Sequence, residues 1–548
     1  MQKAESRTIS LLFTAGVITF CLSIIWVNLH NSQWFNFDML ADATFVQKAA
    51  TDDSLFPANW MFGNQFYIIA TPVLSIPFYF ISHNAVFSIS FASILMMFLI
   101  LYVFFWSFHK TINKSAMSVG LFCMSGATIL GDSASSCTFG FQIIYTMASY
   151  YACYILVILL HLGIWNRYMS RIKVSNWLVV IALFSSFCLG IQSLRETLSL
   201  CIPFLFLTVL VYLRERSESA QNSLFFAIGT TAVNVIGLIL NHYIASFPSI
   251  LRSTNLTPIQ FEWNLSSFAT KIYENLSIFS EFIGFRYWDY NWKWKPLAAL
   301  GLFSLLLGII ALLLCIKIKT HPLRLPIFFC WLSLLGVMAA GILVIHIRAI
   351  YFFVWLILIP LSTAFLIDVS GTKIRLLCQV AILLCGAINY IYNFYPDFCR
   401  YHEQKEFYNS IVSWLDEKAI NRIYGDYQAP TISAFSGSSI SYTSVFPNLS
   451  ATSQKDGLLV PYGSPVALDG YLSVVPETSA LILSDSPYDS FSGYRYLNEH
   501  ASSAYKDLFD DCFHHVMDFQ SDHINYSIYL FDQPTLFPSQ YITQYLQP

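Results

Sequence analysis

Charged side chains are scarce in this chain of 548 residues. Asp, Glu, Lys and Arg make up 11% of it, whereas hydrophobic residues make up 56%. Soluble domains are about 25% charged and about 45–50% apolar. Together with a mean hydropathy of +0.56, this composition predicts an integral membrane protein. The formal net charge is −3, so no basic surface indicates a nucleic-acid partner.

Several short motifs that mark enzyme classes are also absent. The sequence has no GxxxxGK[ST] phosphate loop, no GxSxG elbow, no HExxH zinc motif and no dinucleotide fingerprint. Its 12 cysteines include no CxxC pair, and most lie in apolar runs, where cysteine usually serves as a small hydrophobic residue. Cys399 and Cys512 lie in the polar C-terminal part and could pair.

Long apolar runs are abundant instead. A helix needs about 20 apolar residues to cross the bilayer. By that measure the sequence predicts about eleven transmembrane helices, at 9–29, 84–106, 116–131, 141–164, 176–191, 198–213, 223–245, 297–316, 325–345, 349–368 and 374–395. A further apolar run, 66–82, contains Pro72 and Pro77. Because two prolines disrupt a straight span, we expect a short helix that lies at the interface or dips into it.

The positions of Lys and Arg predict the orientation. With the N-terminus inside, basic residues fall in the short cytoplasmic loops, as the positive-inside rule expects; these loops are 109–115, 165–175, 214–222, 317–324 and 369–375. A full crossing by 66–82 would move every later basic loop outside. The sequence therefore predicts a polytopic α-helical protein with its N-terminus in and its C-terminus out.

The C-terminal part, 396–548, has the pattern of a soluble α/β domain outside the membrane. Helical periodicity covers 400–418, and short strands are predicted at 421–427, 479–484 and 525–531. We therefore expect a transmembrane domain at 1–395, with a first outer loop at 30–83, followed by this extracytoplasmic domain.

The first outer loop concentrates acidic residues. Asp38 and Asp42 follow the first span closely, and a spacing of four would place them on one helix face. A carboxylate just outside the hydrocarbon can act as a general base or bind a divalent metal. The alternative is that both are solvated loop acids, as expected for Asp52 and Asp53.

Charged residues recur at other predicted outer ends of spans. Asp132 lies in a very short loop, where it could be functional or could cap a helix. Arg195 and Glu196 lie between two spans, either as an ion pair or on a substrate path. His346 and Arg348 lie between spans nine and ten. Arg348 could simply snorkel to the interface, but two outer arginines would also suit an anionic lipid head group.

These features resemble, in their order, the GT-C superfamily of integral-membrane glycosyltransferases. The resemblance is to bacterial members related to the protein mannosyltransferase and aminoarabinose transferase group. The resemblance rests on an acid in the first outer loop and another in the next one. It also rests on an arginine between short spans, an arginine-aromatic pattern at a late span and an α/β tail. The residues concerned are Asp38 in FNFDMLAD (35–42), Trp60, Tyr67, Thr71, Pro72, Asp132, Arg195, Pro203, Arg348, Tyr351 and Phe352.

The resemblance implies a sugar donor carried on polyprenyl phosphate and an extracytoplasmic glycan, lipid or protein acceptor. Asp38 would be the base for the acceptor, with Asp42 as the alternative, and Asp132 would assist acceptor or metal binding. Arg195 and Arg348 would neutralise the leaving lipid phosphate; Glu196, His346, Tyr351, Trp60 and Tyr67 would complete the substrate site. The first loop lacks an acid adjacent to Asp38, so a divalent metal stays an open alternative.

Two other classes of function remain. A lipid-linked glycan transporter or flippase would need polar residues in mid-membrane, of which Asn234 and Asn241 are two, and no internal repeat indicates one. A non-catalytic GT-C-like glycan-binding membrane protein would tolerate replacement of Asp38. In all three cases we expect a multi-pass protein of a bacterial plasma membrane.

Overall fold

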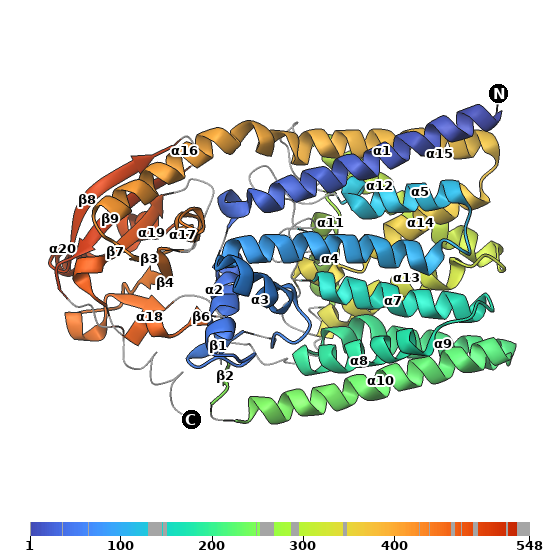
Figure 1. Cartoon of the computed structure of the whole chain (residues 1–548), viewed down its shortest axis with the longest axis horizontal. Coiled ribbons are helices and arrows are strands. Elements are labelled where there is room, and N and C mark those ends of the chain that lie inside the picture. Colours follow the sequence, from blue (N-terminus) through green and yellow to red (C-terminus); the bar gives the residue numbers. More distant parts are fainter. Residues whose placement is uncertain are drawn as a thin grey trace.

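A computed structural model shows a helical bundle at one end of the molecule and a sheet domain at the other (Figure 1). It describes residues 2–35, 37–63, 65–129, 145, 151–247, 249–252, 268–285, 295–343, 348–426, 428–437, 439–461, 466–472, 474–485, 492–521, 524–533 and 537. The N-terminal end of α1 lies at the end of the bundle that is farthest from the sheet domain.

The described residues include nine helical segments long and apolar enough to cross a membrane. They are formed by α1 (Gln2–Leu29), α4 (Ala85–Phe108), α7 (Ala152–Met169), η4 with α9 (Thr197–Cys201, Ile202–Glu215), α10 (Glu218–Ala245), α12 (Lys295–Lys317), α13 (Arg324–Leu343), η7 with α14 (Ala349–Phe352, Trp355–Val369) and α15 (Thr372–Asn393). The polytopic helical fold expected from composition is confirmed.

Two expected spans correspond to shorter helices. The run 176–191 forms α8 (Asn176–Gln192). The run 116–131 forms α5 (Lys114–Phe122), which continues into a π-helical turn, η2 (Cys123–Ala127). Gly126 adopts a φ of 122° in that turn, a conformation that side chains oppose, and the helix ends there.

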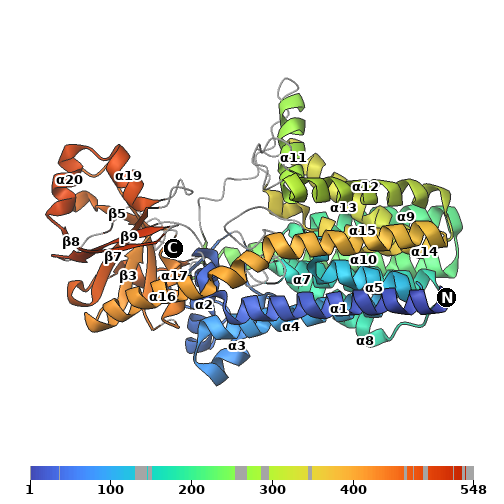
Figure 2. The same cartoon turned by 90° about the horizontal axis from the view of Figure 1, so that it is seen from above.

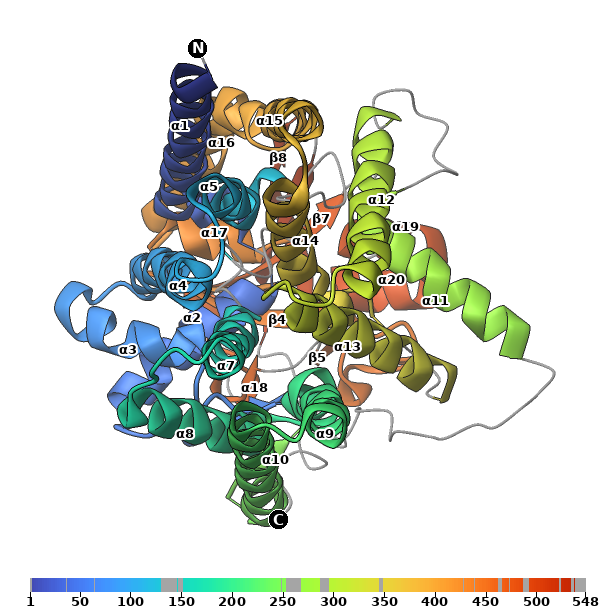
Figure 3. The ribbon, with the colours of Figure 1, turned by 90° about the vertical axis from the view of Figure 1, so that its right-hand side faces the viewer.

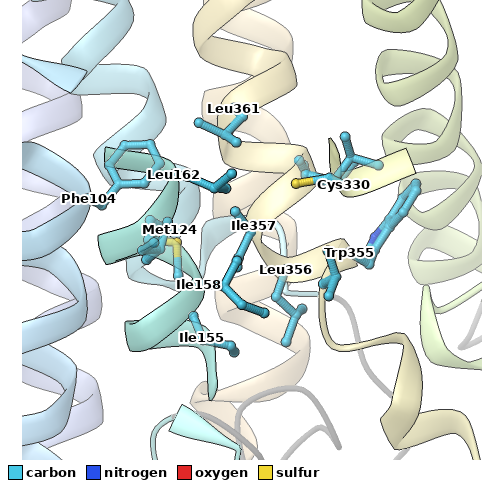
Figure 4. Close-up of a cluster of buried hydrophobic side chains, with 14 of the residues drawn as sticks. Phe104, Met124, Ile155, Ile158, Leu162, Cys330, Trp355, Leu356, Ile357 and Leu361 are labelled. Carbon is cyan, nitrogen blue, oxygen red and sulfur yellow. The ribbon is translucent and has the colours of Figure 1, made fainter. Parts of the chain in front are cut away.

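The centre of the bundle is formed by α7 and α14. The spans that contain them are 83% and 89% buried, whereas those of α1 and α15 are 28% buried. Figure 3 looks along the bundle and shows α14 and α7 surrounded by other helices. In Figure 4, Ile158 and Leu162 of α7 point towards Ile357 and Leu361 of α14. Apolar interdigitation of this kind is what fixes helices in a bundle.

Two glycines let α8 and α10 approach closely. A Cβ on Gly190 would lie 2.3 Å from the Asn234 carbonyl oxygen, and one on Gly237 would lie 2.3 Å from the Phe187 carbonyl oxygen. Small residues at helix crossings allow this backbone contact in membrane proteins.

The first outer loop is folded. It contains η1 (Asn31–Trp34), α2 (Phe37–Thr51), β1 (Trp60–Phe62) and α3 (Thr71–Ser82). With 12 residues, α3 is about 18 Å long, too short to cross the bilayer, as its two prolines predicted. Figure 2 shows another short helix, α11 (Phe268–Phe282), standing across the direction of the spans.

The C-terminal part contains a six-stranded sheet of order β5-β4-β3-β7-β9-β8. Its strands are β3 (Arg422–Gly425), β4 (Ser441–Pro447), β5 (Leu459–Pro461), β7 (Ser479–Asp485), β8 (Phe513–Gln520) and β9 (Asn525–Phe531). Strand β3 is parallel to β4 and β7, and the β7–β9 and β9–β8 pairs are antiparallel. The helices are α16 (Tyr395–Glu417), α17 (Pro430–Phe435), α18 (Asp469–Leu472), α19 (Gly493–His500) and α20 (Ser503–Asp510), with short turns η8 (Gln454–Asp456) and η9 (Pro476–Thr478).

Alternation along β7 builds two apolar layers. Ala480 and Ile482 lie in one core, with Ile411 and Leu415 of α16, while Leu481 belongs to the core on the other face. The three expected strands are thus present, and so is the expected helix before them. Cys399 and Cys512 are free thiols, so they do not pair.

A second, small sheet joins parts of the chain that are far apart in the sequence. Strand β1 of the first outer loop pairs with β2 (Leu251–Arg252) and with β6 (Val466–Ala467) of the C-terminal part. Figure 1 shows these strands and α2 between the bundle and the sheet domain. The first outer loop therefore lies between the bundle and the sheet domain and pairs through β1 with a strand of the C-terminal part.

Candidate functional site

Helix α2 carries the two acids that the sequence singled out. Asp38 is in its first turn and Asp42 is one turn later. The rest of the helix is anchored by apolar contacts: Met39 and Val46 share a core with Val86 and Ile89 of α4. Because buried side chains fix α2 on several sides, the backbone that presents the acids is rigidly placed.

Asp38 is exposed to solvent but has much protein around it. That surrounding protein raises its carboxyl pKa above the ordinary value, and the positive charge of Arg348 lowers it in part. Arg348 is itself exposed, just before η7. The structure thus brings together two residues that are distant in the sequence, an accessible acid and an accessible cation.

Asp42 lies in a different environment. It is 2% exposed, and burial raises its pKa to about 8, although a hydrogen bond from Tyr67 lowers it and the Asp38 charge raises it slightly further. Among the described residues, its Oδ1 atom has no hydrogen-bond partner. Two neighbouring carboxyl groups with such different surroundings can take different protonation states at one pH. Asp42 is protonated at neutral pH, and Asp38 is the one that solvent reaches.

Trp60 and Tyr67 lie beneath this surface. They are 1% and 2% exposed and pack with Phe45, whose ring centroid is 5.5 Å from that of Trp60 and 4.6 Å from that of Tyr67. In this position they support α2, and Tyr67 also contacts Asp42. Asp52 and Asp53 are exposed, and Asp52 accepts a hydrogen bond from the Ala58 amide, as expected for loop acids.

Arg195 lies in the turn between α8 and η4. One of its guanidinium nitrogens donates to Gln65 Oε1 of the first outer loop. The guanidinium carbon lies 5.1 Å from the ring centroid of Tyr151 and 6.0 Å from that of Tyr351. Tyr351 follows Arg348 in η7, with its amide bonded to the Arg348 carbonyl. Two aromatic faces therefore hold the arginine near the segment that begins with Arg348.

The first outer loop is also fixed to the end of α8. Gln192 Oε1 accepts hydrogen bonds from the amides of Ile68 and Ile69, at 3.2 and 3.1 Å. Gln192 Nε2 donates to the Tyr154 hydroxyl, which lies 2.7 Å from Ser193 Oγ. Four residues of this region, Gln65, Tyr151, Tyr154 and Gln192, were not predicted from the sequence. The one signal for Gln192 was an uncharged amide at the end of an apolar run.

Helix lengths explain why the first outer loop meets the end of α8 at a deeper level in the bundle than the end of α10. Helix α8 has 17 residues and α10 has 28, or about 25 Å and about 42 Å. Gly237 meets Ile191 at the end of α8, and α10 continues to Ala245. The turn that carries Arg195 thus lies about two helical turns below the end of α10.

Glu196 has partners inside the bundle. It is 1% exposed; one carboxyl oxygen lies 2.7 Å from Ser186 Oγ, and the other accepts from Asn234 Nδ2 at 2.9 Å. The interpretation of Arg195 and Glu196 as a helix-junction ion pair is therefore replaced by two separate roles. Arg195 contacts the outer loop, whereas Glu196 contacts α8 and α10.

Two predicted site residues, Asp132 and His346, lie outside the described residues. Within the described part of the chain, no three His, Cys, Asp or Glu side chains are grouped so that they could hold a metal ion.

A pocket lies on another side of α2, between this helix and the sheet domain. It is lined by Phe37, Leu40, Ala41, Thr44, Tyr442, Thr443, Ser444, Ala467 and Tyr471. The helical spacing of Phe37, Leu40, Ala41 and Thr44 places this lining face away from Asp38 and Asp42. The pocket is thus a feature of the domain junction, separate from the acids.

No family model matches the chain, and no curated protein matches it. One solved structure to which the fold is similar is the crystal structure of ArnT from Cupriavidus metallidurans bound to undecaprenyl phosphate. The match covers 93% of this chain and 97% of that one, at 10% sequence identity and a TM-score of 0.49.

Proposed function

We propose that this protein is a membrane glycosyltransferase that moves a sugar from a polyprenyl-phosphate donor to an acceptor outside the cytoplasm. The observation that carries the proposal is the placement of the accessible acid Asp38 near the accessible cation Arg348. Arg195 and Tyr351 lie beside the same segment. An acid near a cation at the outer ends of spans suits a reaction that takes up a proton and releases a lipid phosphate.

In the proposed reaction, Asp38 removes the proton from an acceptor hydroxyl or amine. The acceptor atom then bonds to the anomeric carbon of the sugar, and the bond from that carbon to the phosphate oxygen breaks. Its electron pair stays on the polyprenyl phosphate. Arg348 stabilises the negative charge that grows on this leaving group, and the aromatic-held guanidinium of Arg195 is its second partner.

The neighbouring acid supports this division of roles. Protonated Asp42 adds no negative charge beside Asp38 at neutral pH, so it does not raise the cost of ionising Asp38. The raised pKa of Asp38 also makes it a stronger base than an ordinary aspartate once it is ionised. Asp38 is therefore favoured over Asp42 as the base.

The transporter alternative gains no support from the polar residues on which it depended. Asn234 binds Glu196 and the Ser186 carbonyl, and Asn241 donates to the Ile191 carbonyl. Both asparagines are thus used in contacts between helices.

The test uses the purified full-length protein with a panel of polyprenyl-phosphate sugars and envelope extract as the acceptor source. The readout is released polyprenyl phosphate. We expect Asp38→Asn to lower turnover by about 10²-fold or more, since a general base contributes about that much. Asp53→Asn is the matched control, because it removes an exposed acid of the same loop at a residue with φ 49°, where asparagine is tolerated. Wild-type turnover in folded Asp38→Asn would remove Asp38 from the mechanism.

A further inference from the structure

A buried polar cluster lies where α7, α8, η4 and α10 meet; Figure 3 shows α7, α8 and α10 side by side. Its members are Glu196, Ser186, His161 and Asn234, which are at most 1% exposed. The proposed reaction uses none of them. Ionisable groups inside a helical bundle are energetically costly. The presence of Glu196 and His161 here therefore indicates a function.

The amide of Asn234 is fully used. Its Nδ2 donates to Glu196 Oε2 at 2.9 Å and to the Ser186 carbonyl at 3.0 Å, and its Oδ1 accepts from Thr197 Oγ1 at 2.6 Å. Because a backbone carbonyl only accepts, the amide nitrogen has to face Ser186. One Glu196 oxygen therefore accepts a hydrogen bond from a neutral donor.

The other Glu196 oxygen belongs to a chain of hydrogen bonds. Ser186 Oγ lies 2.7 Å from Glu196 Oε1 and 3.2 Å from His161 Nε2. His161 Nδ1 lies 2.8 Å from the Val157 carbonyl, so Nδ1 carries a proton. A serine hydroxyl has a single proton and can donate to only one of its two neighbours.

Two arrangements satisfy every group. In the first, a neutral Glu196 acid donates to Ser186, which donates to neutral His161. In the second, a cationic His161 donates to Ser186, which donates to a Glu196 carboxylate. The His161 ring stacks on Phe226 at 5.1 Å and meets Phe204 edge-on at 6.3 Å. Among such apolar surroundings, separated charges cost more than neutral groups that form the same hydrogen bonds.

The other titratable groups near Glu196 do not reverse this preference. Cys188 and Cys201 are close enough to interact with it electrostatically, and a thiol carries no positive charge that would stabilise a carboxylate. Arg195, the adjacent residue, binds Gln65 and stacks over Tyr151.

Glu196 also stands directly before the π-helical turn η4. Such turns are often found at functional sites. Contacts on several sides secure this one: Thr197 bonds Asn234 of α10, and the Ser199 carbonyl accepts from Ser333 Oγ of α13 at 2.8 Å. Ser199 Oγ in turn donates to the Arg195 carbonyl at 2.9 Å.

We propose that Glu196 is a positioning residue that acts as a neutral carboxylic acid, fixing the turn from which Arg195 projects while adding no charge that would cancel the arginine's own. The role assigned to Arg195 rests on the proposed function, whereas the neutral state of Glu196 does not. A carboxylate at this position would weaken the attraction between Arg195 and a lipid phosphate.

The discriminating variant is Glu196→Gln, because its amide can donate to Ser186 and accept from Asn234 as the protonated acid does. We expect its KM for the polyprenyl-phosphate donor, and its affinity for polyprenyl phosphate alone, to stay within about twofold of wild type. Glu196→Leu removes one hydrogen-bond partner each from Ser186 and Asn234, and we expect it to weaken donor and polyprenyl-phosphate binding by about tenfold, with a smaller change in kcat. If Glu196→Gln is as damaging as Glu196→Leu, the proposal is wrong.

Ser186→Ala provides a second route if the leucine variant does not fold. It should weaken polyprenyl-phosphate binding in the same way, whereas Ser185→Ala should not, because the Ser185 hydroxyl is exposed on α8 and donates to the Ile181 carbonyl of the same helix. Equal binding by the two serine variants would contradict the positioning role.

Infrared spectroscopy tests the protonation state without any assay of activity. The difference spectrum between wild type and Glu196→Gln should contain the C=O band of a carboxylic acid; carboxylate bands in its place would overturn the proposal. If this band is present but no variant transfers sugar, the proposed function fails while the neutral Glu196 stands. If transfer occurs but carboxylate bands are found, the proposed function stands and the neutral Glu196 is wrong.

Discussion

Lys48 of α2 and Asp469 of the sheet domain form an ion pair across 421 residues of sequence. Asp469 also accepts a hydrogen bond from Asn59 Nδ2 at 2.9 Å. At the other end of α2, Thr431 of α17 donates to the Phe35 carbonyl at 2.9 Å. The sheet domain therefore holds both ends of the helix that carries Asp38 and Asp42, which gives it a part in the site even though it contributes neither acid.

A double-mutant cycle on Lys48 and Asp469 measures this connection. Lys48→Met and Asp469→Asn should each lower the free energy of unfolding by about 1 kcal/mol or less, because Asp469 is 47% exposed and exposed pairs contribute little. The double variant should lose less than the sum of the two single losses, and the exchanged pair Lys48→Asp with Asp469→Lys should recover part of it. Strictly additive losses in thermal unfolding would show that the pair does not couple the domains.

At the crossing of α8 and α10, adding a single methyl group should lower stability more than losing the Lys48–Asp469 ion pair does. A methyl group at Gly190 or Gly237 would lie 2.3 Å from a backbone oxygen of the facing helix, and backbone cannot move aside as a side chain can. We expect Gly190→Ala and Gly237→Ala each to lower stability by about 1–3 kcal/mol and to reduce transfer, since the crossing sets the level of the turn with Arg195.

Two glycines of the bundle provide the controls for that measurement. A Cβ at Gly229, also in α10, would meet Leu183 at 3.5 Å, and one at Gly336 would meet nothing within 4 Å. Alanine there should be neutral or stabilising by up to about 1 kcal/mol, because it favours the helix. If all four variants unfold at the same temperature, the close backbone contact between α8 and α10 does not determine the stability of the bundle.

The helices and strands could be predicted from sequence because each depends on a local pattern. Apolar runs of span length predicted the bundle, and short runs of aliphatic and aromatic residues predicted β3, β7 and β9. The small sheet of β1, β2 and β6 could not be predicted, because its strands have two or three residues and pair only through tertiary contact.

The candidate site was predictable only in part for the same reason. Asp38, Arg195 and Arg348 stand out as charges in an apolar chain. Gln65 and Gln192 do not, since an uncharged amide in a loop or at the end of an apolar run indicates no particular partner until the fold is known. The sequence also paired Arg195 with its neighbour Glu196, because adjacency is visible in sequence whereas the distance to Ser186 and Asn234 depends on how α8 and α10 cross.

The buried carboxyl of Asp42 predicts how stability depends on pH. Its pKa is about 8 in the folded protein, against an ordinary value of 3.8. Between these values the folded state keeps a proton that the unfolded state has lost. The stability associated with that proton is fully present below about pH 4 and declines by about 1.4 kcal/mol per pH unit until about pH 8. Asp42→Asn is uncharged at every pH and should remove this decline.

Unfolding temperatures of detergent-solubilised protein between about pH 5 and about pH 9 check this. The difference between wild type and Asp42→Asn should be smallest at the acid end, and the variant should become increasingly the more stable of the two towards pH 8. Asp53→Asn should follow the wild-type profile, because Asp53 is exposed. Parallel profiles for wild type and Asp42→Asn would mean that Asp42 is ionised in the folded protein. Asp42 would then share the negative charge of α2 with Asp38, and the choice of Asp38 as the base would lose its physical reason.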